Sequence, residues 1–109
     1  IDVRIESSFV EGTIPGAVNL PFGMFTNSEM NPFLNQLLIL LGGELQASGE
    51  WGFENASHLL LFCDGPWCGQ PTDAISNLLE VGYPADRLSY YRGGMQSWAS
   101  LGLTMAVPG

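Results

Sequence analysis

Short apolar runs along the chain alternate with segments in which apolar residues recur every three or four positions. The run at residues 59–62 is apolar throughout, which is typical of a central β-strand that is buried on both faces. Shorter runs at 1–3, 17–20 and 88–91 predict further strands, and residues 104–107 are expected to return as an extended tail.

Three helices are expected among these strands. The first covers residues 31–41, because Asn31 is a good N-cap and the proline after it fits the first helical position. The second covers residues 71–81, since proline is tolerated in the first turn of a helix but not in its interior. The third is short and contains Trp98, which we expect in the core. The expected buried residues are Phe33, Leu34, Leu37, Leu38 and Leu41 in the first helix, Ile75, Leu78 and Leu79 in the second, and Tyr83 just after it.

The alternation of strands and helices predicts an α/β domain with a mainly parallel sheet flanked by helices. With 109 residues, 46% of them hydrophobic, the chain is long enough for one core and one domain. Its formal net charge is −8, and its three basic residues are all arginines. Such a surface repels phosphate backbones and anionic lipids, so we expect no nucleic-acid partner. No apolar run is long enough to cross a bilayer, so no membrane insertion is expected.

The candidate chemistry lies in residues 63–70, which read Cys-Asp-Gly-Pro-Trp-Cys-Gly-Gln between a predicted strand and a predicted helix. Open α/β sheets bind ligands at the carboxyl ends of their strands. A loop that curls there turns its N–H groups inward, and the helix dipole adds positive potential, so both stabilise a thiolate on Cys63. We predict that Cys63 is a nucleophile; the alternative is a buried structural cysteine. The N–H donors of this anion cradle belong to Asp64, Gly65, Trp67, Cys68, Gly69 and Gln70, whereas Pro66 has none.

Two other cysteine chemistries do not fit this loop. A phosphatase loop needs an arginine at its end to hold the phosphoryl oxygens, and Gly69 and Gln70 stand there instead. A metal site would have three soft ligands, His58, Cys63 and Cys68, and His58 is at the opposite end of the strand from Cys63. We therefore expect neither a metal nor another cofactor.

Five motifs, in order and over nearly the whole chain, resemble the rhodanese-like (thiosulfate sulfurtransferase) domain family. They are Asp2-x-Arg4; Phe9-x-x-Gly12-x-Ile14-Pro15-Gly16-Ala17-x-Asn19-Leu20-Pro21; Phe62-Cys63-x-x-x-x-Cys68; Gly82-Tyr83; and Arg92-Gly93-Gly94-x-x-x-Trp98. The resemblance implies a three-layer rhodanese-like fold. It also implies that residues 1–109 are a single domain without its usual first strand and helix, which we expect to belong to a longer chain with room for a partner domain.

The resemblance also implies a mechanism. Cys63 would take sulfane sulfur as a persulfide from a small donor, which could be thiosulfate, a polysulfide or a protein persulfide, and pass it to a thiol acceptor. No cofactor is needed. We associate this form of the loop, Cys-x-Gly-Pro-x-Cys, with exported bacterial members of the family, which favours the periplasm over the cytoplasm.

The chain departs from the family pattern near the nucleophile. Many single-domain members have an arginine where this sequence has Cys68, and the loop contains no basic residue. Asp64 places a carboxylate beside Cys63; we expect it to point to solvent, because a carboxylate facing the cradle would repel thiosulfate. Thr13 stands where the family often has histidine. These differences leave the sulfur donor open.

Two arginines are expected at the edge of the sheet that holds Cys63. Arg4 and Arg92 both follow predicted strands, so together they would attract anions in an otherwise acidic protein. For Arg4 the structural alternative is an ion pair with Asp2 that braces the loops. For Arg92 the alternative is pairing at a helix terminus or on the surface.

The role of Cys68 has several readings. It could resolve a persulfide on Cys63 into a disulfide and release sulfide, or cycle with Cys63 as a dithiol switch. It could form a stable disulfide that blocks the nucleophile, or it could be an idle thiol. The alternative to a sulfurtransferase is thus a non-catalytic or redox-regulatory module in which Cys63 and Cys68 form a disulfide.

Overall fold

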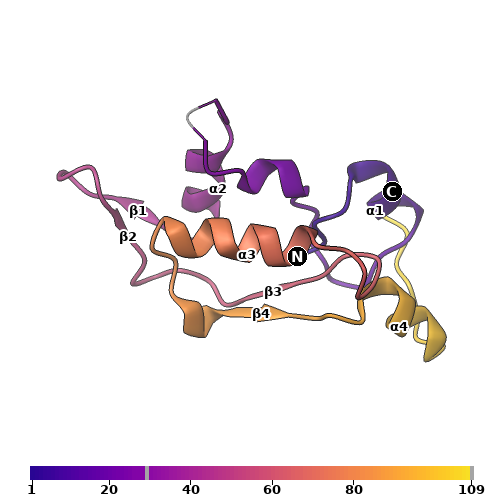
Figure 1. Cartoon of the computed structure of the whole chain (residues 1–109). Coiled ribbons are helices and arrows are strands. Elements are labelled where there is room, and N and C mark those ends of the chain that lie inside the picture. The colour runs from indigo at the N-terminus through magenta and orange to yellow at the C-terminus, as the bar shows by residue number, and fades with distance from the viewer. Residues whose placement is uncertain (29, 109) are drawn as a thin grey trace.

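The structure, a computed structural model, describes residues 1–28 and 30–108 (Figure 1). None of the helices in this part of the chain has the length and apolar character needed to span a membrane. The elements are α1 (Glu6–Glu11), the 3-10 helix η1 (Phe22–Phe25), α2 (Leu34–Leu40), β1 (Glu44–Leu45), β2 (Trp51–Gly52), β3 (Leu59–Leu61), α3 (Gln70–Glu80), the 3-10 helix η2 (Ala85–Arg87), β4 (Leu88–Tyr90) and α4 (Gly94–Ser100).

Parallel pairing organises the central sheet. Strands β3 and β4 pair in parallel, with Leu61 opposite Tyr90. Asp2 extends this arrangement, because it forms parallel bridges to Phe62 on one side and to Asn19 on the other. The extended segments therefore lie in the order 17–20, 1–3, β3, β4, and the predicted α/β class with a mainly parallel sheet is confirmed.

The core lies where α3 and α2 cover the sheet. Helix α3 contacts β4 and η1, and α2 packs against η1 as well. Figure 1 shows α3 lying along β3 and β4, with α4 beyond the carboxyl ends of these strands. The residues that fill this core with no more than 2% of their surface exposed include Val3, Phe25, Leu37, Leu38, Leu61, Ala74, Leu78 and Tyr83.

The prediction that the strand at 59–62 is buried on both faces is wrong. Leu59 and Leu61 are 6% and 0% exposed and belong to the core cluster, whereas Leu60 is 51% exposed. Successive side chains of a strand point to opposite faces, so the helices cover the face that carries Leu59 and Leu61. On the other face only the end of the strand is covered, at Phe62, which is 3% exposed.

Several helix details also differ from the sequence prediction. Helix α2 begins at Leu34, because Asn31 Oδ1 accepts from the backbone N–H of Phe33 and turns the chain one residue before the helix begins. Phe33 is 51% exposed, so it lies outside the core. Leu79 is 44% exposed, and Ala74 contributes to the buried face of α3 instead. Trp98 is only partly buried, and its Nε1 donates to Thr104 O.

Four local structures are absent from the sequence prediction. Helix α1 forms soon after the predicted strand at 1–3, η1 follows Pro21, and η2 precedes β4. The segment 44–57 contains the antiparallel hairpin β1–β2, in which Glu44 pairs with Gly52. The expected tail at 104–107 contributes one antiparallel bridge, between Ala106 and Thr13.

Candidate functional site

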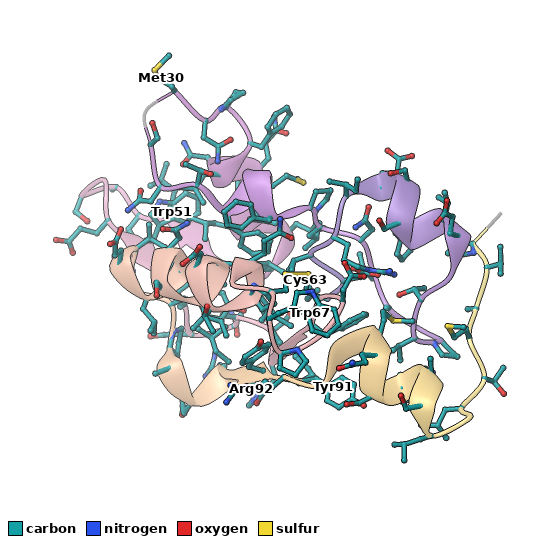
Figure 2. All side chains as sticks on the ribbon, turned by 45° about the vertical axis from the view of Figure 1, so that its right-hand side comes forward. Met30, Trp51, Cys63, Trp67, Tyr91 and Arg92 are labelled. Carbon is teal, nitrogen blue, oxygen red and sulfur yellow. A yellow bond between two sulfur atoms is a disulfide. The ribbon has the colours of Figure 1, made fainter. Side chains whose placement is uncertain are left out.

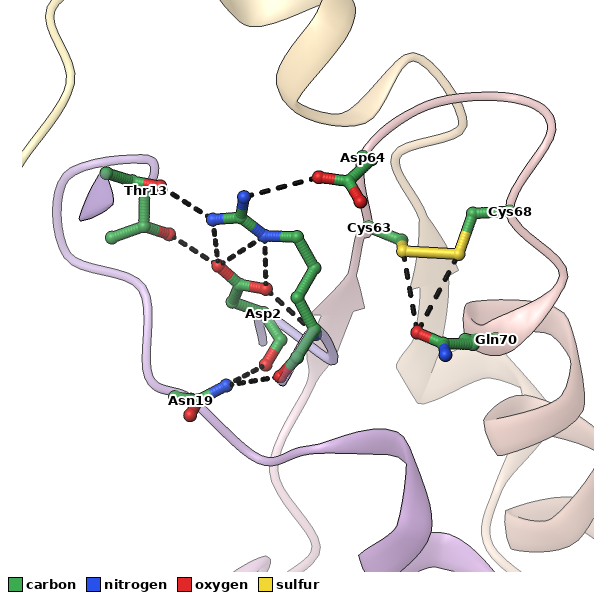
Figure 3. A network of polar contacts seen from close by, with 9 residues as sticks. Asp2, Thr13, Asn19, Cys63, Asp64, Cys68 and Gln70 are labelled. Carbon is green, nitrogen blue, oxygen red and sulfur yellow. Dashed lines mark hydrogen bonds and ion pairs between the residues drawn. A yellow bond between two sulfur atoms is a disulfide. The ribbon is translucent and has the colours of Figure 1, made fainter. Parts of the chain in front are cut away.

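The loop between β3 and α3 is closed by a disulfide between Cys63 and Cys68 (Figure 3). Cys63 follows β3 after one residue, Phe62, and α3 begins at Gln70, so the loop occupies the strand-to-helix position that the sequence indicates. The Cα atoms of the two cysteines are 6.3 Å apart. Cys63 is 3% exposed and belongs to the core cluster, whereas Cys68 is partly exposed.

Helix α4 contacts the beginning of this loop through backbone hydrogen bonds. The backbone N–H groups of Met95 and Gln96 donate to Cys63 O at 3.0 Å and Asp64 O at 2.8 Å. In a trans peptide the N–H points opposite to the C=O, so the N–H groups of Asp64 and Gly65 point away from these helix donors. The carbonyl groups of the loop are thus used for structure, and two of its amides are left for other partners.

Glycine is required at the first residue of α4. Gly94 has a φ of +55°, which side chains rarely tolerate, and a Cβ there would overlap Cys63 O and lie 2.9 Å from Gly65 N. Gly93 and Gly94 were identified from the sequence only as part of the last motif. The contact of Gly94 with the backbone of Cys63 depends on how α4 folds back on the loop, and no local pattern indicates that.

Trp67 covers the tip of the loop. Its ring packs against Gly65, where a Cβ would overlap the ring, and the side chain is nevertheless 67% exposed. The backbone N–H of Cys68 donates to Gly65 O at 3.1 Å, which closes the turn at Pro66. The loop glycine therefore serves the approach of Trp67 as well as the tight turn.

A buried ion pair stands beside the loop (Figure 3). Asp2 is fully buried, and its carboxylate accepts from Arg4 Nη2 at 2.8 Å, from Arg4 Nε at 3.0 Å and from Thr13 Oγ1 at 2.9 Å. Asn19 Nδ2 donates to the carbonyl oxygens of both Asp2 and Arg4. Thr13 and Asn19 lie in the second sequence motif, but their side-chain contacts to Asp2 were not predicted.

Arg4 connects this buried pair to the loop. Its Nη1 lies 3.3 Å from Asp64 Oδ1, and its Nη2 also donates to Gly12 O. Burial opposes the charge of Arg4, but its hydrogen bonds and ion pairs with Asp2 and Asp64 outweigh burial and hold the pKa of the guanidinium above its ordinary value. Asp64 is half-exposed and paired with Arg4, but Arg4 also pairs with Asp2, so the two carboxylates and one guanidinium together carry a formal charge of −1 beside Cys63.

Gln70 approaches both sulfur atoms. Its Oε1 lies 3.6 Å from Cys63 Sγ and 3.8 Å from Cys68 Sγ. A disulfide sulfur has no proton to donate, so these are close contacts in the oxidised loop and become potential hydrogen bonds once the thiols form. Only the backbone N–H of Gln70 was predicted to face the sulfur, because the direction of its side chain cannot be inferred from the loop sequence.

A pocket of about 400 Å³ opens beside Cys68. Figure 2 shows Trp67 beside Cys63, and Arg92 on the segment that follows β4. Arg92 is exposed and reaches the pocket from the end of β4, on the sheet edge predicted for it. The pocket is lined by Pro66, Trp67, Cys68, Gly69, Thr72, Tyr90 and Arg92.

The structure does not bring His58 to this site. His58 is exposed just before β3, at the end of the strand opposite to Cys63. Within residues 1–28 and 30–108, no three His, Cys, Asp or Glu side chains are grouped as metal ligands would be.

A parallel sheet with a cysteine loop at the carboxyl end of a central strand places the chain among the α/β domains. The chain belongs to the Rhodanese-like domain family, whose model matches residues 1–101. No match is found among curated proteins.

Two solved structures resemble the fold. A rhodanese-related protein from Thermoplasma volcanium superposes with a TM-score of 0.63 at 18% sequence identity, over 99% of this chain and 82% of that one. A protein from Bacillus halodurans superposes with a TM-score of 0.60 at 20% identity, over 96% of this chain and 60% of that one. The chain thus spans less than two thirds of the Bacillus halodurans protein.

Proposed function

We propose that this domain is a sulfurtransferase that carries sulfane sulfur as a persulfide on Cys63. The observation that carries the proposal is the position of Cys63 at the head of a loop between β3 and α3. In the described part of the chain, the N–H groups of Asp64, Gly65 and Trp67 donate to no backbone carbonyl. Such amides, with the positive end of α3, are suited to stabilise the terminal sulfur of a persulfide anion.

The loading step is a displacement at sulfur. The Cys63 thiolate attacks the outer sulfur of thiosulfate, the S–S bond of the donor breaks, and sulfite leaves with the electron pair. A polysulfide or a protein persulfide would react in the same way. The polysulfide would leave as a chain one sulfur atom shorter, and the protein persulfide would leave as a thiolate. The ion pair with Arg4 weakens the repulsion between Asp64 and an anionic donor but does not cancel it, because Arg4 also pairs with Asp2.

The persulfide can then react in two ways. An acceptor thiolate can take the terminal sulfur, which returns Cys63 as a thiolate. Alternatively, the thiol of Cys68 attacks the inner sulfur, which forms the Cys63–Cys68 disulfide and releases hydrosulfide. The second reaction is supported by the pairing of the two cysteines across the loop.

The second candidate function is a redox-regulatory module. The same disulfide favours it, because a closed Cys63–Cys68 pair leaves no thiolate to accept sulfur. The two functions differ in one respect: a regulatory disulfide forms without sulfur gain, whereas the sulfurtransferase gains one sulfur atom before its disulfide forms.

The test exposes fully reduced protein to thiosulfate and, separately, to a polysulfide, and then measures its intact mass. The Cys68→Ser variant should gain one sulfur atom and keep it, wild type should gain one before its disulfide closes, and the matched Cys63→Ser variant should gain none. Closure of the disulfide with no sulfur gained in any sample would instead support the regulatory module.

A further inference from the structure

The two sulfur atoms of the disulfide differ in their access to solvent. Cys63 is 3% exposed and packs in the core cluster, and Gln70 stands over both sulfurs from the side of α3. Cys68 is partly exposed and lines the 400 Å³ pocket. A thiolate that arrives from solvent therefore meets Cys68 first.

The pocket also contains Arg92, which differs from the other two arginines in its contacts with the described residues. Arg4 is paired with Asp2 and Asp64. Arg87 donates through Nη1 to three backbone carbonyls in the turn at residues 53–56. Arg92 is exposed, lines the pocket and forms no ion pair within residues 1–28 and 30–108.

The remaining walls suit a small organic molecule. Trp67 and Tyr90 supply aromatic surface, and Thr72 adds a hydroxyl at the first turn of α3. A volume of about 400 Å³ is in the range of small-molecule sites, which is roughly 300–1,000 Å³. In a chain with a net charge of −8, an exposed arginine that has no ion pair among the described residues selects for a negatively charged group in such a pocket.

We propose that this pocket binds a low-molecular-weight thiol that carries a carboxylate, and that the thiolate of this molecule opens the disulfide by attack on Cys68. Arg92 holds the carboxylate, and Trp67 and Tyr90 flank the carbon skeleton. The inference rests on the proposed function, because the disulfide must be reopened before Cys63 can accept sulfur again.

The exchange takes two steps. The incoming thiolate forms a bond to Cys68 Sγ, the Cys63–Cys68 bond breaks, and Cys63 leaves as the thiolate. A second molecule of the thiol then attacks the mixed disulfide on Cys68, which releases the oxidised small disulfide and frees Cys68. Two small thiols are oxidised and one protein disulfide is reduced.

The first arm of the test compares two reductants on oxidised wild-type protein. Glutathione is the anionic probe and 2-mercaptoethanol is the neutral one, and the readout is the ratio of their second-order rate constants. In Arg92→Gln this ratio should fall by about threefold to fivefold, as expected for the loss of an exposed ion pair, and added salt should reduce the difference between the two proteins.

Ser48→Asp is the matched charge control. It also lowers the net charge by one, but at an exposed residue in the turn between β1 and β2, at the far end of the molecule from the loop (Figure 1). Its ratio should remain that of wild type. An unchanged ratio in Arg92→Gln, or an equal fall in Ser48→Asp, would overturn the proposal.

The second arm identifies the sulfur that is attacked. Oxidised wild-type protein is mixed briefly with glutathione and quenched with N-ethylmaleimide, and the mixed disulfide is located by fragment mass spectrometry. Glutathione should be found on Cys68 and the maleimide on Cys63; the reverse assignment would overturn the proposal. Sulfur loading of the reduced sample is measured in parallel, so a failure of loading with glutathione still on Cys68 would contradict the sulfurtransferase and leave the exchange site standing.

Discussion

Arg4 Nη1 lies 3.3 Å from Asp64 Oδ1, so the carboxylate next to Cys63 is held by the side chain that also neutralises the buried Asp2. The Arg4 guanidinium thereby links the start of the Cys63–Cys68 loop to the neighbouring strand segment that contains Asp2. The two carboxylates differ greatly in exposure, since Asp2 is fully buried and the Asp64 side chain is 54% exposed. Their contributions to stability should therefore differ as well.

Replacement of Arg4 should be far more costly than replacement of Asp64. Arg4→Gln leaves the Asp2 carboxylate buried without its counter-charge, which typically lowers the free energy of unfolding by about 3–5 kcal/mol. Asp64→Asn removes only an exposed ion pair, with an expected effect below about 1 kcal/mol. Urea unfolding of both variants measures the difference in the free energy of unfolding. Equal losses would contradict the claim that the buried Arg4–Asp2 pair stabilises the fold more than the exposed Arg4–Asp64 pair.

Gly94 should be required for loop placement. In Gly94→Ala the new methyl group must displace Cys63 O or the start of α4, in addition to the strain of the left-handed backbone. Gly102→Ala is the matched control, since Gly102 has a φ of +71° with no atom near its Cβ position. The control should lose about 1–2 kcal/mol from backbone strain alone, and Gly94→Ala should lose clearly more in the same urea experiment.

The uneven coverage of β3 makes a second stability comparison possible. Leu61 is fully buried and Leu60 is 51% exposed, although the two are neighbours of the same type. Leu61→Ala should cost about 2–5 kcal/mol, and Leu60→Ala less than about 1 kcal/mol. Comparable losses in the two variants would mean that both faces of the strand are covered.

Tyr83 should make the domain less stable at alkaline pH. Burial raises the pKa of its phenol, which Arg87 lowers only in part, and its hydroxyl donates to Ser57 O. The folded state thus retains a proton that the unfolded state releases near pH 10, so the stabilisation is complete below about pH 10 and is lost as pH rises through the higher folded pKa.

The urea midpoint of wild type should accordingly fall as the pH rises above about 10, beyond any change seen in Tyr83→Phe. At neutral pH the same variant should lose about 1 kcal/mol, because the hydrogen bond to Ser57 O is absent. Tyr91→Phe serves as the control for the loss of a tyrosine and should retain the alkaline decline. An identical decline in Tyr83→Phe would remove Tyr83 as its source.

The elements that the sequence predicts correctly are those with strong local signals. The continuous apolar run before Cys63 and the proline at the start of α3 place the loop between β3 and α3. The exposure of Leu60 could not be predicted, because an apolar run does not reveal which face the helices cover. Gly94 and Gln70 meet the cysteines through the tertiary fold, so their contacts have no signature in neighbouring residues.

In the candidate site, too, some residues could be predicted from local sequence patterns and others depend on the tertiary fold. Arg4, Cys63 and Arg92 were predicted at one edge of the sheet from their positions after strands, since parallel strands end at a common edge. Asp2 was named as the ion-pair partner in the structural alternative for Arg4. The spacing of Cys63 and Cys68 left a stable disulfide, a resolving thiol, a dithiol switch and an idle thiol open, because a sequence separation of five permits all of them. The pocket that contains Tyr90 and Thr72 requires the packing of β4 against α3, which no motif encodes.

The most direct test of the account is a single turnover of reduced protein loaded with one equivalent of polysulfide sulfur, with hydrosulfide and intact mass followed together. Wild type should gain sulfur and then lose it as hydrosulfide while its disulfide closes in equal amount, whereas Cys68→Ser should keep the persulfide. Equal hydrosulfide release from Cys68→Ser, or sulfur gain by Cys63→Ser, would contradict the claim that Cys63 carries the sulfur and Cys68 resolves it.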